Sequence, residues 1–569
     1  MNAKRIKKAL SPLAFLLFPK MRPSGDLIAT GYSNPTVDFV TTWNERCGIA
    51  AYSSSLISEL RKSFTIRIVP VSHAPAFSPY FFVLGLKLGR NSGLIHIQFA
   101  YDMFTHLNLG KKRILAFSAF LFYLGLALSA HKANHVITTF HDPLETINRT
   151  NFAGYAYLKA QAFLLCVTSD IVIALNEKSG NQLISNYGVP KSKIKTIPIG
   201  CIEKPQFMDK KQCKETLHLA EKTVLTLPGF VIRNKGHDMI IKIMPLLGEN
   251  VKLLIAGGAH TEEDALYLEE LKDLARRNNV ADKVVFDDSF PITSTLMNAT
   301  DIALLPYKRA NESMMVRDLI SFRVPTIASN IPIFEKIKDK YDCIELFEEG
   351  NAEDLLKKIN ALILDKKKQA LLRSNCDKMW NDDKWSSIAN KHLEPYLEAM
   401  AAVPEDIYYE ERQKERINWL KENLSGPSLE IGCATGYVTN GAGADIGLDL
   451  NQYRVRVAKL KYPSKEFIIA SAENLPFKQG AFSTVIIPEI LEHVPLSLAN
   501  KILIESNRVG SEILITLPNA EKPNHDKNIV ENPEHKWYPT QEIVKKIVGK
   551  CVIQYSAEKD FMFVIVRKT

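Results

Sequence analysis

The chain has 569 residues, of which 46% are hydrophobic and 24% are charged, an ordinary composition for a globular protein. This length exceeds what one hydrophobic core supports, so we expect three or four domains. The formal net charge of +9 favours anionic neighbours such as phospholipids, nucleotides or polyanionic glycans. A basic and aromatic stripe is absent from the sequence, so nucleic acid is not expected as a partner. The eight cysteines form no Cys-x-x-Cys pair, which argues against a zinc site and a disulfide scaffold and favours a reducing cytoplasm.

Two segments raise the question of a membrane. Residues 1–36 form a basic N-terminal extension whose apolar run, Leu13–Phe18, is too short to cross a bilayer. This extension could lie on anionic lipid as an amphipathic segment, or it could be a solvated tail. The nearly uncharged stretch Ile114–Ala130 is also short for a membrane span, so we expect a buried or membrane-facing helix of a soluble domain. The expected location is the cytoplasm, with a peripheral position on the inner face of the plasma membrane as an option.

The first unit is predicted over residues 37–200, where strands and helices alternate as in a parallel sheet with crossover helices. A helix is expected to begin directly after Gly48, because the apolar residues that follow recur with helical spacing. A later helix is expected to have Asn176 as its N-cap and to end at Gly188. The predicted strands are Val37–Thr41, Thr65–Val69, Leu94–Ile97, Val136–Phe140 and Ile171–Leu175.

The second unit is predicted over residues 201–400, with the crossing from the first sheet at Pro198–Gln206. Helical stretches that contain Trp380 and Trp385 close it, and Ala401–Asp406 is the expected linker to a third unit. The predicted strands are Thr223–Leu227, Val251–Ala256, Lys283–Phe286, Asp301–Leu305 and Thr326–Ala328.

The third unit is predicted over residues 408–569 and repeats the alternation of strands and helices. The overall fold class is therefore α/β, with three Rossmann-like domains in succession. The predicted strands of the third unit are Leu429–Ile431, Ile446–Leu448, Phe467–Ala470, Thr484–Ile487, Glu512–Thr516, Val552–Tyr555 and Phe561–Val566.

The first two units carry three polar or glycine-containing motifs at strand ends. The motifs are Cys47-Gly48-Ile49-Ala50, His141-Asp142-Pro143 and Arg233-Asn234-Lys235-Gly236. Ligands of open parallel sheets bind at the carboxyl ends of the strands, and helix N-termini at that edge attract phosphate. Two such domains facing one another suit a nucleotide sugar as ligand.

With these motifs, residues 37–395 resemble a GT-B-fold glycosyltransferase of the large retaining family, glycosyl transferase group 1 of the family 4 type. The resemblance implies that Gly48 lets the backbone approach the donor diphosphate and that His141 contacts the donor sugar. It also implies that Arg233 and Lys235 neutralise the diphosphate leaving group, whose charge grows in the transition state. Such a fold binds the diphosphate with protein groups, so we expect no required metal ion.

The chain departs from the family pattern at two points. Phe230 stands where the family commonly has an arginine. Many members carry a pair of glutamates, of which Ala310 replaces the first and Asp318 the second. Asp318 is expected to bind the ribose hydroxyls. Glu312 and Ser313 are the nearby residues expected to contact the sugar. These departures leave the donor open between a GDP-sugar and a UDP-sugar.

The third unit carries the features that an adenosyl cofactor requires. Gly432 and Gly436 form a glycine turn after the first strand, and Asp449 ends the second strand, where a carboxylate can hold both ribose hydroxyls. Ala472 and Glu473 follow the third strand, where adenine is expected.

Residues 408–569 resemble the class I S-adenosylmethionine-dependent methyltransferases, an assignment that rests on the combined pattern and not on the glycine turn alone. The resemblance adds Glu430, on the first strand, to the expected cofactor contacts. Candidate bases for methyl transfer are Glu492, His525, His535 and His493, of which His493 is carried forward as the catalytic candidate.

Three departures from this second pattern leave a decayed, purely structural domain as an alternative. Ala434 replaces the middle glycine of the turn, Ser471 stands where an adenine-binding aspartate is frequent, and Ser483 stands where an aspartate usually follows phenylalanine.

Together, the two resemblances imply a bifunctional enzyme of surface-polysaccharide, glycolipid or glycoprotein biosynthesis. One half would transfer a hexose from a nucleotide-diphosphate sugar to a glycan or lipid-linked acceptor, and the other would methylate a sugar hydroxyl. In a second version, methylation of the acceptor stops chain growth. In a third, an active glycosyltransferase carries a methyltransferase-like domain that serves as a scaffold.

Overall fold

The computed structural model describes residues 36–43, 47–71, 78–91, 94–100, 107–109, 112–114, 117–129, 135–141, 152–259, 261–288, 292–401, 411–520, 535–549, 552–554 and 561–567. The expected basic extension, apart from its last residue, lies outside the described residues. The same holds for Asp142, Pro143, His525 and all but the first residue of the expected linker Ala401–Asp406.

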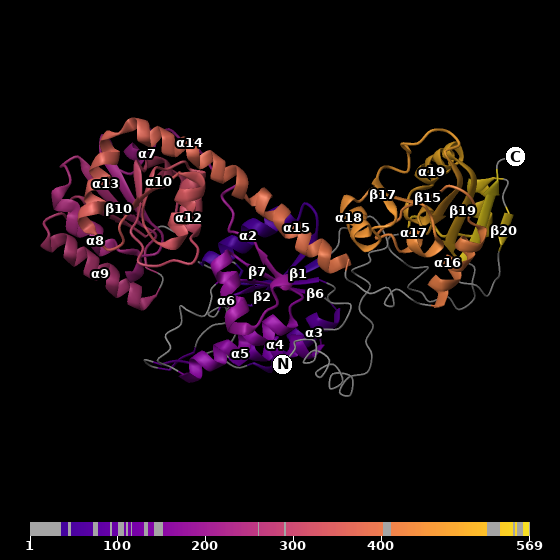
Figure 1. Ribbon diagram of the computed structural model, residues 1–569, viewed down its shortest axis with the longest axis horizontal. Coiled ribbons are helices and arrows are strands. Elements are labelled where there is room, and N and C mark those ends of the chain that lie inside the picture. Colours follow the sequence, from indigo (N-terminus) through magenta and orange to yellow (C-terminus); the bar gives the residue numbers. More distant parts are fainter. Residues whose placement is uncertain are drawn as a thin grey trace.

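The first sheet has six parallel strands in the order β2-β1-β3-β6-β7-β8 (Figure 1). Its strands are β1 Thr36–Thr41, β2 Thr65–Pro70, β3 Leu94–Phe99, β6 His135–Phe140, β7 Ile171–Ala174 and β8 Ile194–Thr196. Its helices are α2 Gly48–Leu60, α3 Pro79–Asn91, α4 Phe117–Ser129, α5 Phe152–Thr168 and α6 Glu177–Tyr187, and a separate hairpin joins β4 Leu107–Leu109 to β5 Lys112–Ile114. The five predicted strands, the start of α2 after Cys47 and the caps of α6 at Asn176 and Gly188 are confirmed.

The long apolar stretch of this unit forms helix α4, which crosses α3 at very short range. A Cβ atom added to Gly85 would lie 2.2 Å from the carbonyl oxygen of Phe122, and one added to Gly125 would lie 2.3 Å from that of Phe82. Phe122, Tyr123 and Leu126 of α4 are buried. Among the described helices, none is both long and apolar enough to cross a membrane.

The second sheet also has six parallel strands, in the order β11-β10-β9-β12-β13-β14. Its strands are β9 Thr223–Pro228, β10 Val251–Ala256, β11 Val284–Asp287, β12 Ile302–Leu305, β13 Thr326–Ser329 and β14 Glu345–Phe347. Its helices include α7 Lys210–Thr216, α8 His237–Ile243, α9 Glu262–Arg277, α10 Ser294–Ala299, α11 Met314–Ser321, α12 Pro332–Tyr341 and α13 Ala352–Leu364. Strand order reverses between β9 and β12, so the loops after these two strands border the expected ligand crevice.

Two long helices carry the chain from the second unit back across the first (Figure 1). Helix α14 spans Lys366–Asp383 and helix α15 spans Trp385–Ala401. Trp385 and Tyr396 of α15 are buried in one cluster with Phe39 and Tyr52 of the first unit. The predicted second unit runs to residue 400 and so includes α15. In the structure, this packing joins α15 to the first sheet.

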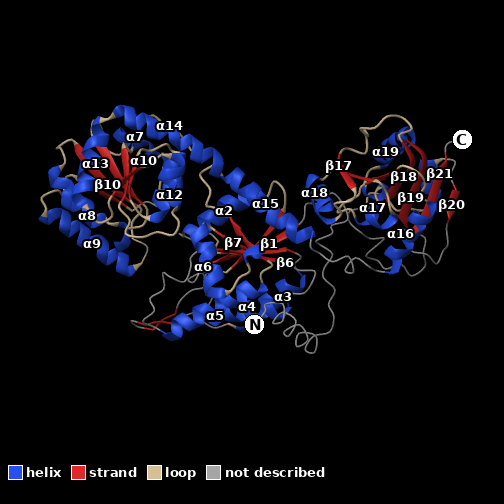
Figure 2. Cartoon of the chain, in the orientation of Figure 1, coloured by secondary structure: helices blue, strands red, loops and turns tan. Residues whose placement is uncertain are grey.

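The third sheet has seven strands in the order β17-β16-β15-β18-β19-β21-β20 (Figure 2). Its strands are β15 Ser428–Ile431, β16 Ile446–Asp449, β17 Glu466–Ile469, β18 Phe482–Pro488, β19 Gly510–Pro518, β20 Val552–Gln554 and β21 Phe561–Arg567, and β21 runs antiparallel to its neighbours. Its helices are α16 Glu411–Asn423, α17 Tyr437–Ala442, α18 Gln452–Lys461, α19 Leu496–Val509 and α21 Gln541–Val548. Here strand order reverses between β15 and β18.

Helix α18 joins the third unit to the first. Val457 of α18 is fully buried in the cluster that contains Tyr396. The ring of Tyr453 lies 5.8 Å from that of Phe64, and Arg456 forms a 2.6 Å ion pair with Glu394 of α15. The three sheets therefore form one connected chain of domains, with the first unit in the middle (Figure 1).

Candidate functional sites

The glycine loop of the first unit lies against the second unit. Cys47 caps α2 by accepting a hydrogen bond from the amide of Ala50 at 3.3 Å. A Cβ atom added to Gly48 would lie 3.9 Å from Sδ of Met314, the first residue of α11. The predicted glycine loop therefore faces the N-terminal end of α11 across the boundary between the two units.

His141 directly follows β6 and is held by a buried polar chain. The Nε2 atom of His141 lies 2.8 Å from the side-chain oxygen Oε1 of Gln98. The side-chain nitrogen Nε2 of Gln98 lies 3.1 Å from Nε2 of His96. Burial lowers the pKa of His141 to about 3, so the ring is neutral at physiological pH. Because an amide oxygen only accepts, Nε2 carries the ring proton and Nδ1 is left as an acceptor.

Lys235 lies at the reversal point of the second sheet. The chain leaves β9 through Gly229 and forms a short 3₁₀ turn, Arg233–Lys235, before α8. A Cβ atom added to Gly229, which has a φ of 96°, would lie 2.7 Å from Nζ of Lys235, so the ammonium group lies close against this glycine. Burial lowers the pKa of Lys235 to about 8. Within the described chain, no acceptor lies within hydrogen-bond distance of this Nζ.

Arg233 points elsewhere, although the sequence groups it with Lys235. Its NH2 group lies 2.7 and 2.8 Å from the two carboxylate oxygens of Glu270 on α9. The guanidinium also stacks 4.5 Å from the ring centre of Tyr267. The structure therefore gives Arg233 a surface partner, and its role at the diphosphate stays a prediction.

The N-terminus of α11 carries the two residues expected at the donor sugar. Ser313 is the N-cap and accepts a hydrogen bond from the amide of Val316 at 3.4 Å. Glu312 is nearly buried and accepts from the side-chain amide of Asn176, in the first unit, at 3.3 Å. Burial raises the pKa of Glu312, while nearby Arg317 opposes that shift.

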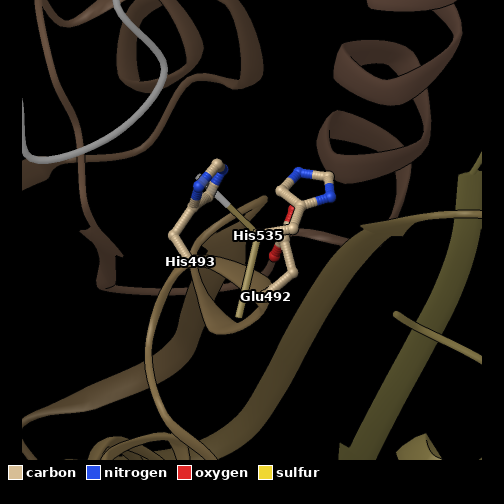
Figure 3. A group of neighbouring side chains, drawn as sticks. All are labelled: Glu492, His493 and His535. Carbon is tan, nitrogen blue, oxygen red and sulfur yellow. The ribbon is translucent and has the colours of Figure 1, made fainter. Parts of the chain in front are cut away.

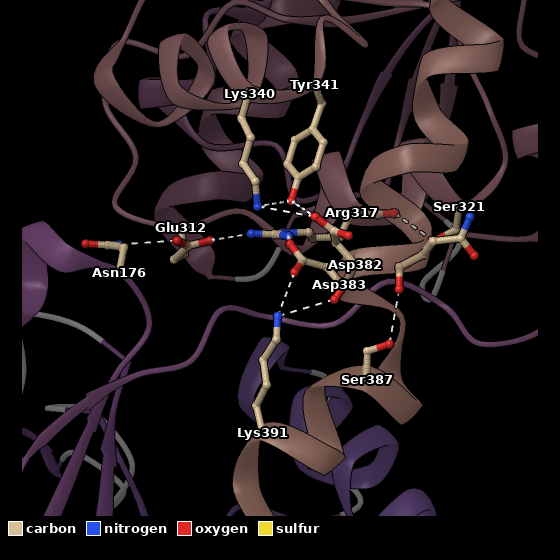
Figure 4. Close-up of polar contacts among 11 residues, drawn as sticks. Asn176, Glu312, Arg317, Ser321, Lys340, Tyr341, Asp382, Asp383, Ser387 and Lys391 are labelled. Atoms are coloured by element: carbon tan, nitrogen blue, oxygen red, sulfur yellow. Dashed lines mark hydrogen bonds and ion pairs between the residues drawn. The ribbon is translucent and has the colours of Figure 1, made fainter.

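Arg317 lies between Glu312 and Asp383 and links these two carboxylates (Figure 4). Its fully buried guanidinium pairs with Asp383 at the end of α14 and lies 3.7 Å from Glu312. Asp383 also pairs with Lys391 of α15 at 3.2 Å. The charged network thus connects the α11 N-terminus to the helices that return to the first unit, and it fixes where Glu312 lies.

Asp318 sits one position after Arg317 on the same helix. Burial raises its pKa to about 7, and no described side chain forms an ion pair with it. A desolvated carboxylate of this kind gains from hydroxyl donors, which is the environment expected for a group that binds ribose.

The glycine turn of the third unit follows β15 at the reversal point of that sheet. Gly432 and Gly436 have φ values of 77° and 83°, and Ala434 has φ 45°, in the left-handed region that favours glycine. A Cβ atom added to Gly432 would lie 2.1 Å from Cδ1 of Ile490, which follows β18. The departure at Ala434 therefore places a methyl group where the backbone conformation is strained.

Asp449 ties this turn to the end of β16. One carboxylate oxygen accepts from the amide of Ala434 at 2.9 Å and the other accepts from the amide of Asn451 at 2.8 Å. A carboxylate offers about four acceptor positions, so two remain for the hydroxyls of a ribose. The position of Asp449 therefore fits the predicted adenosyl cofactor.

The remaining predicted cofactor contacts lie in different environments. Glu430 is fully buried and accepts a hydrogen bond from the hydroxyl of Thr439 on α17, and burial raises its pKa to about 7. This placement suits a residue that braces the turn from behind. Ala472 is half-buried after β17, whereas Glu473 is exposed and lies 3.7 Å from Lys501.

His493, the predicted base, lies in the turn Leu491–His493 after β18 and is nearly buried. The side chains of Glu492 and His535 lie close to that of His493 (Figure 3). The rings of His493 and His535 are 4.9 Å apart. Glu492 and His535, two of the other candidate bases, therefore lie next to His493, although His535 is far from it in the sequence.

Sequence reasoning missed Gln98 and Tyr307. Gln98 orients His141, and Tyr307 places its ring 5.7 Å from Nζ of Lys235. The available signal for Gln98 was a pair of polar residues, His96 and Gln98, on one face of the otherwise apolar strand β3. The feature that could have pointed to Tyr307 was its position just after β12, at the reversal point of the second sheet.

Two known protein families match parts of this chain. Residues 209–379 match the family Glycosyl transferases group 1, and residues 429–512 match the family Methyltransferase domain. An uncharacterised glycosyltransferase of Haemophilus influenzae is 25% identical over 218 residues, which are 37% of this chain and 57% of that protein. The chain thus spans little more than half the length of that curated relative.

Solved structures show the fold of the first two units. The Anabaena protein HepE in complex with UDP-glucose has a TM-score of 0.52 at 16% identity, covering 63% of this chain and 99% of its own. Sucrose-phosphate synthase of Thermosynechococcus elongatus has a TM-score of 0.51 at 15% identity, covering 64% of this chain and 99% of its own.

The chain therefore contains a group 1 glycosyltransferase domain and, after it, a methyltransferase domain. The first two units form a GT-B pair of Rossmann-like domains, as the sequence predicted, and the third unit is a further Rossmann-like domain.

Proposed function

We propose that this chain is a bifunctional transferase that transfers a hexose from a nucleotide-diphosphate sugar with retention and methylates a sugar hydroxyl. The products would belong to a surface polysaccharide, a glycolipid or a glycoprotein. The observation that carries the first activity is Lys235, a cation with no acceptor among the described residues, beside Gly229 at the reversal point of the second sheet.

In the glycosyl-transfer step, the bond between sugar C1 and the diphosphate breaks, a bond between C1 and an acceptor hydroxyl oxygen forms, and the hydroxyl proton passes to the departing diphosphate. Negative charge then grows on the departing diphosphate. Lys235 and the N-terminus of α11 place positive charge and N–H donors at that edge, where they stabilise the developing charge. Neutral His141 would accept a hydrogen bond from a hydroxyl of the donor sugar through Nδ1, and Asp318 would hold the ribose.

In the methyl-transfer step, an acceptor oxygen gains the methyl group and loses its proton. S-adenosylmethionine supplies an activated methyl group when bound, so the protein needs mainly to align the reactants and receive the proton. Asp449 and the turn Gly432–Gly436 would hold the cofactor, and His493 would receive the proton.

A panel of donors tests the first activity. UDP-sugars are tried first because a related fold, that of HepE, is seen with UDP-glucose, and GDP-sugars follow. The measurement is donor turnover by the intact protein and by Lys235→Ala, with Lys242→Ala as the matched control. Lys242 is an exposed lysine of α8 that pairs with Asp238. Equal turnover in all three proteins would remove Lys235 from the proposed role.

The scaffold version of the third unit has its own support. Helix α17 after the glycine turn has only six residues, and the backbone of Ala434 is strained. Part of helix α18 packs on the first unit. Binding of S-adenosylhomocysteine, the product of methyl transfer, separates the two versions. A scaffold would show no saturable binding.

A further inference from the structure

The cluster of Glu492, His493 and His535 has the composition of a metal site, although the sequence alone suggested only candidate bases. One potential ligand atom from each side chain lies within 4.8 Å of the others (Figure 3). Two imidazoles and one carboxylate are a ligand set that suits Zn²⁺ and other divalent first-row metals.

Glu492 supplies the independent reason to expect a cation. Its side chain is 1% exposed, and neither carboxylate oxygen has a hydrogen-bond partner among the described residues. Glu489, a neighbouring carboxylate, is already paired with Arg416 at 2.6 Å. A buried carboxylate without a partner is costly, and binding a cation is one of the two ways to relieve that cost; taking up a proton is the other.

The backbone holds the ligands close together. The amide of Lys536 donates to the carbonyl of Glu492 at 2.7 Å. The indole of Trp537 donates to the carbonyls of Leu491 and Val494 at 2.9 and 3.1 Å. These bonds fasten the segment that carries His535 to the turn that carries the other two ligands, so the site is largely assembled by the fold.

We propose that Glu492, His493 and His535 bind one divalent transition-metal ion, with Zn²⁺ as the first candidate. Ligand atoms on one zinc ion lie at most about 4 Å apart, so small rotations of the rings close the remaining gap. Three protein ligands leave a coordination position for water or a hydroxyl oxygen. Ile490, the residue before the turn that carries Glu492 and His493, packs on Gly432, so the cluster lies close to the glycine turn proposed to hold the cofactor. Use of the open coordination position by the acceptor hydroxyl rests on the proposed methyl transfer. With the metal bound, His493 is a ligand, so the metal would lower the pKa of the hydroxyl and the proton would leave to water instead of to His493.

Metal content tests the site without any assay of activity. The untagged full-length protein is dialysed with zinc and then against metal-free buffer, and bound zinc is measured by mass spectrometry. About one zinc ion per chain is expected in the wild type and in the control Glu542→Gln, an exposed glutamate of α21. Less than about a tenth of that is expected in Glu492→Gln and His535→Gln.

Two results would overturn the site. One is zinc content that is the same in all four proteins, and the other is a wild type that holds none, as a protonated Glu492 would require. If a variant fails to fold, cobalt titration of the wild type decides, because nitrogen and oxygen ligands of a low-coordinate Co²⁺ site give intense visible bands and free Co²⁺ does not. None of these readouts needs a methyl donor, so they fail or succeed separately from the proposed function.

Discussion

The carboxyl edges of the second and third sheets have the same topology and opposite charge. In each sheet, strand order reverses beside the first strand of the unit, and a glycine turn follows that strand. At the second sheet the turn presents Lys235, a buried cation without an acceptor among the described residues. At the third sheet it meets Asp449, whose carboxylate already accepts two backbone amides.

This difference follows from what each edge is proposed to bind. A diphosphate brings negative charge that grows during reaction, so a fixed cation helps both binding and catalysis. An adenosyl group brings hydroxyl donors, so a carboxylate with spare acceptor positions suits it. One fold therefore serves two chemistries through the side chains placed at the reversal point and not through the sheet itself.

The largest expected effect comes from removing the cation. Lys235→Ala should lower sugar-transfer turnover about 100- to 1,000-fold, the loss typical when one charge-stabilising donor is removed from a transition state. Steady-state turnover of the reactive UDP- or GDP-sugar measures it. Methyl-donor affinity should be unchanged in the same protein, and a loss in both activities would show that the two edges are not independent.

The second effect comes from removing the carboxylate. Asp449→Ala should weaken binding of S-adenosylhomocysteine by about 10- to 100-fold, because hydrogen bonds to a charged group contribute roughly 1.5–3 kcal/mol. Titration calorimetry measures it. Glu466→Ala is the control, since Glu466 is an exposed carboxylate at the start of the adjacent strand β17. Unchanged affinity in Asp449→Ala would discredit the ribose contact.

The third effect is the pH dependence that Lys235 gives to the second edge. Lys235 has a pKa of about 8, so it loses its charge as the pH rises through that value. Affinity for UDP should be full near pH 7 and fall on the order of tenfold per unit well above pH 8. Lys235→Arg should flatten this profile because arginine keeps its proton. A wild-type affinity that is constant to pH 9.5 would contradict the assignment.

The smallest effect concerns the strained alanine of the third edge. Ala434→Gly should raise the free energy of unfolding by less than about 1 kcal/mol, seen as a small rise in the midpoint of thermal unfolding, because glycine adopts φ 45° freely but gains entropy in the unfolded chain. Ala442→Gly in helix α17 is the matched control, and should lower stability by up to about 1 kcal/mol. Destabilisation by both substitutions would show that the turn is not strained.

Much of this architecture could be predicted from sequence because buried parallel strands are runs of apolar residues. Four strands were missed, β4, β5, β8 and β14, and each has only three residues. Strands β8 and β14 also lie at sheet edges, where half-buried side chains such as those of Ile194 and Leu346 interrupt the apolar run. Strand ends could also be predicted, which is why Gly48, Lys235 and Asp449 could be placed just after or at the end of strands; their roles stay predictions.

Contacts between distant segments could not be predicted in the same way. Gln98 reaches His141 only because β3 and β6 are neighbours in the sheet. His535 reaches Glu492 only because Trp537 is fastened to the turn after β18. Arg233 shows the converse, since its place in the motif beside Lys235 gave no sign of the ion pair with Glu270.

A crossed binding experiment tests the central claim most directly. UDP and S-adenosylhomocysteine are titrated separately into the intact protein and into Lys235→Ala and Asp449→Ala, and heats are recorded by calorimetry. Two independent sites predict that the wild type binds both ligands, that Lys235→Ala weakens only UDP and that Asp449→Ala weakens only the adenosyl compound. Failure of the wild type to bind either ligand, or weakening of both ligands by either substitution, would contradict it.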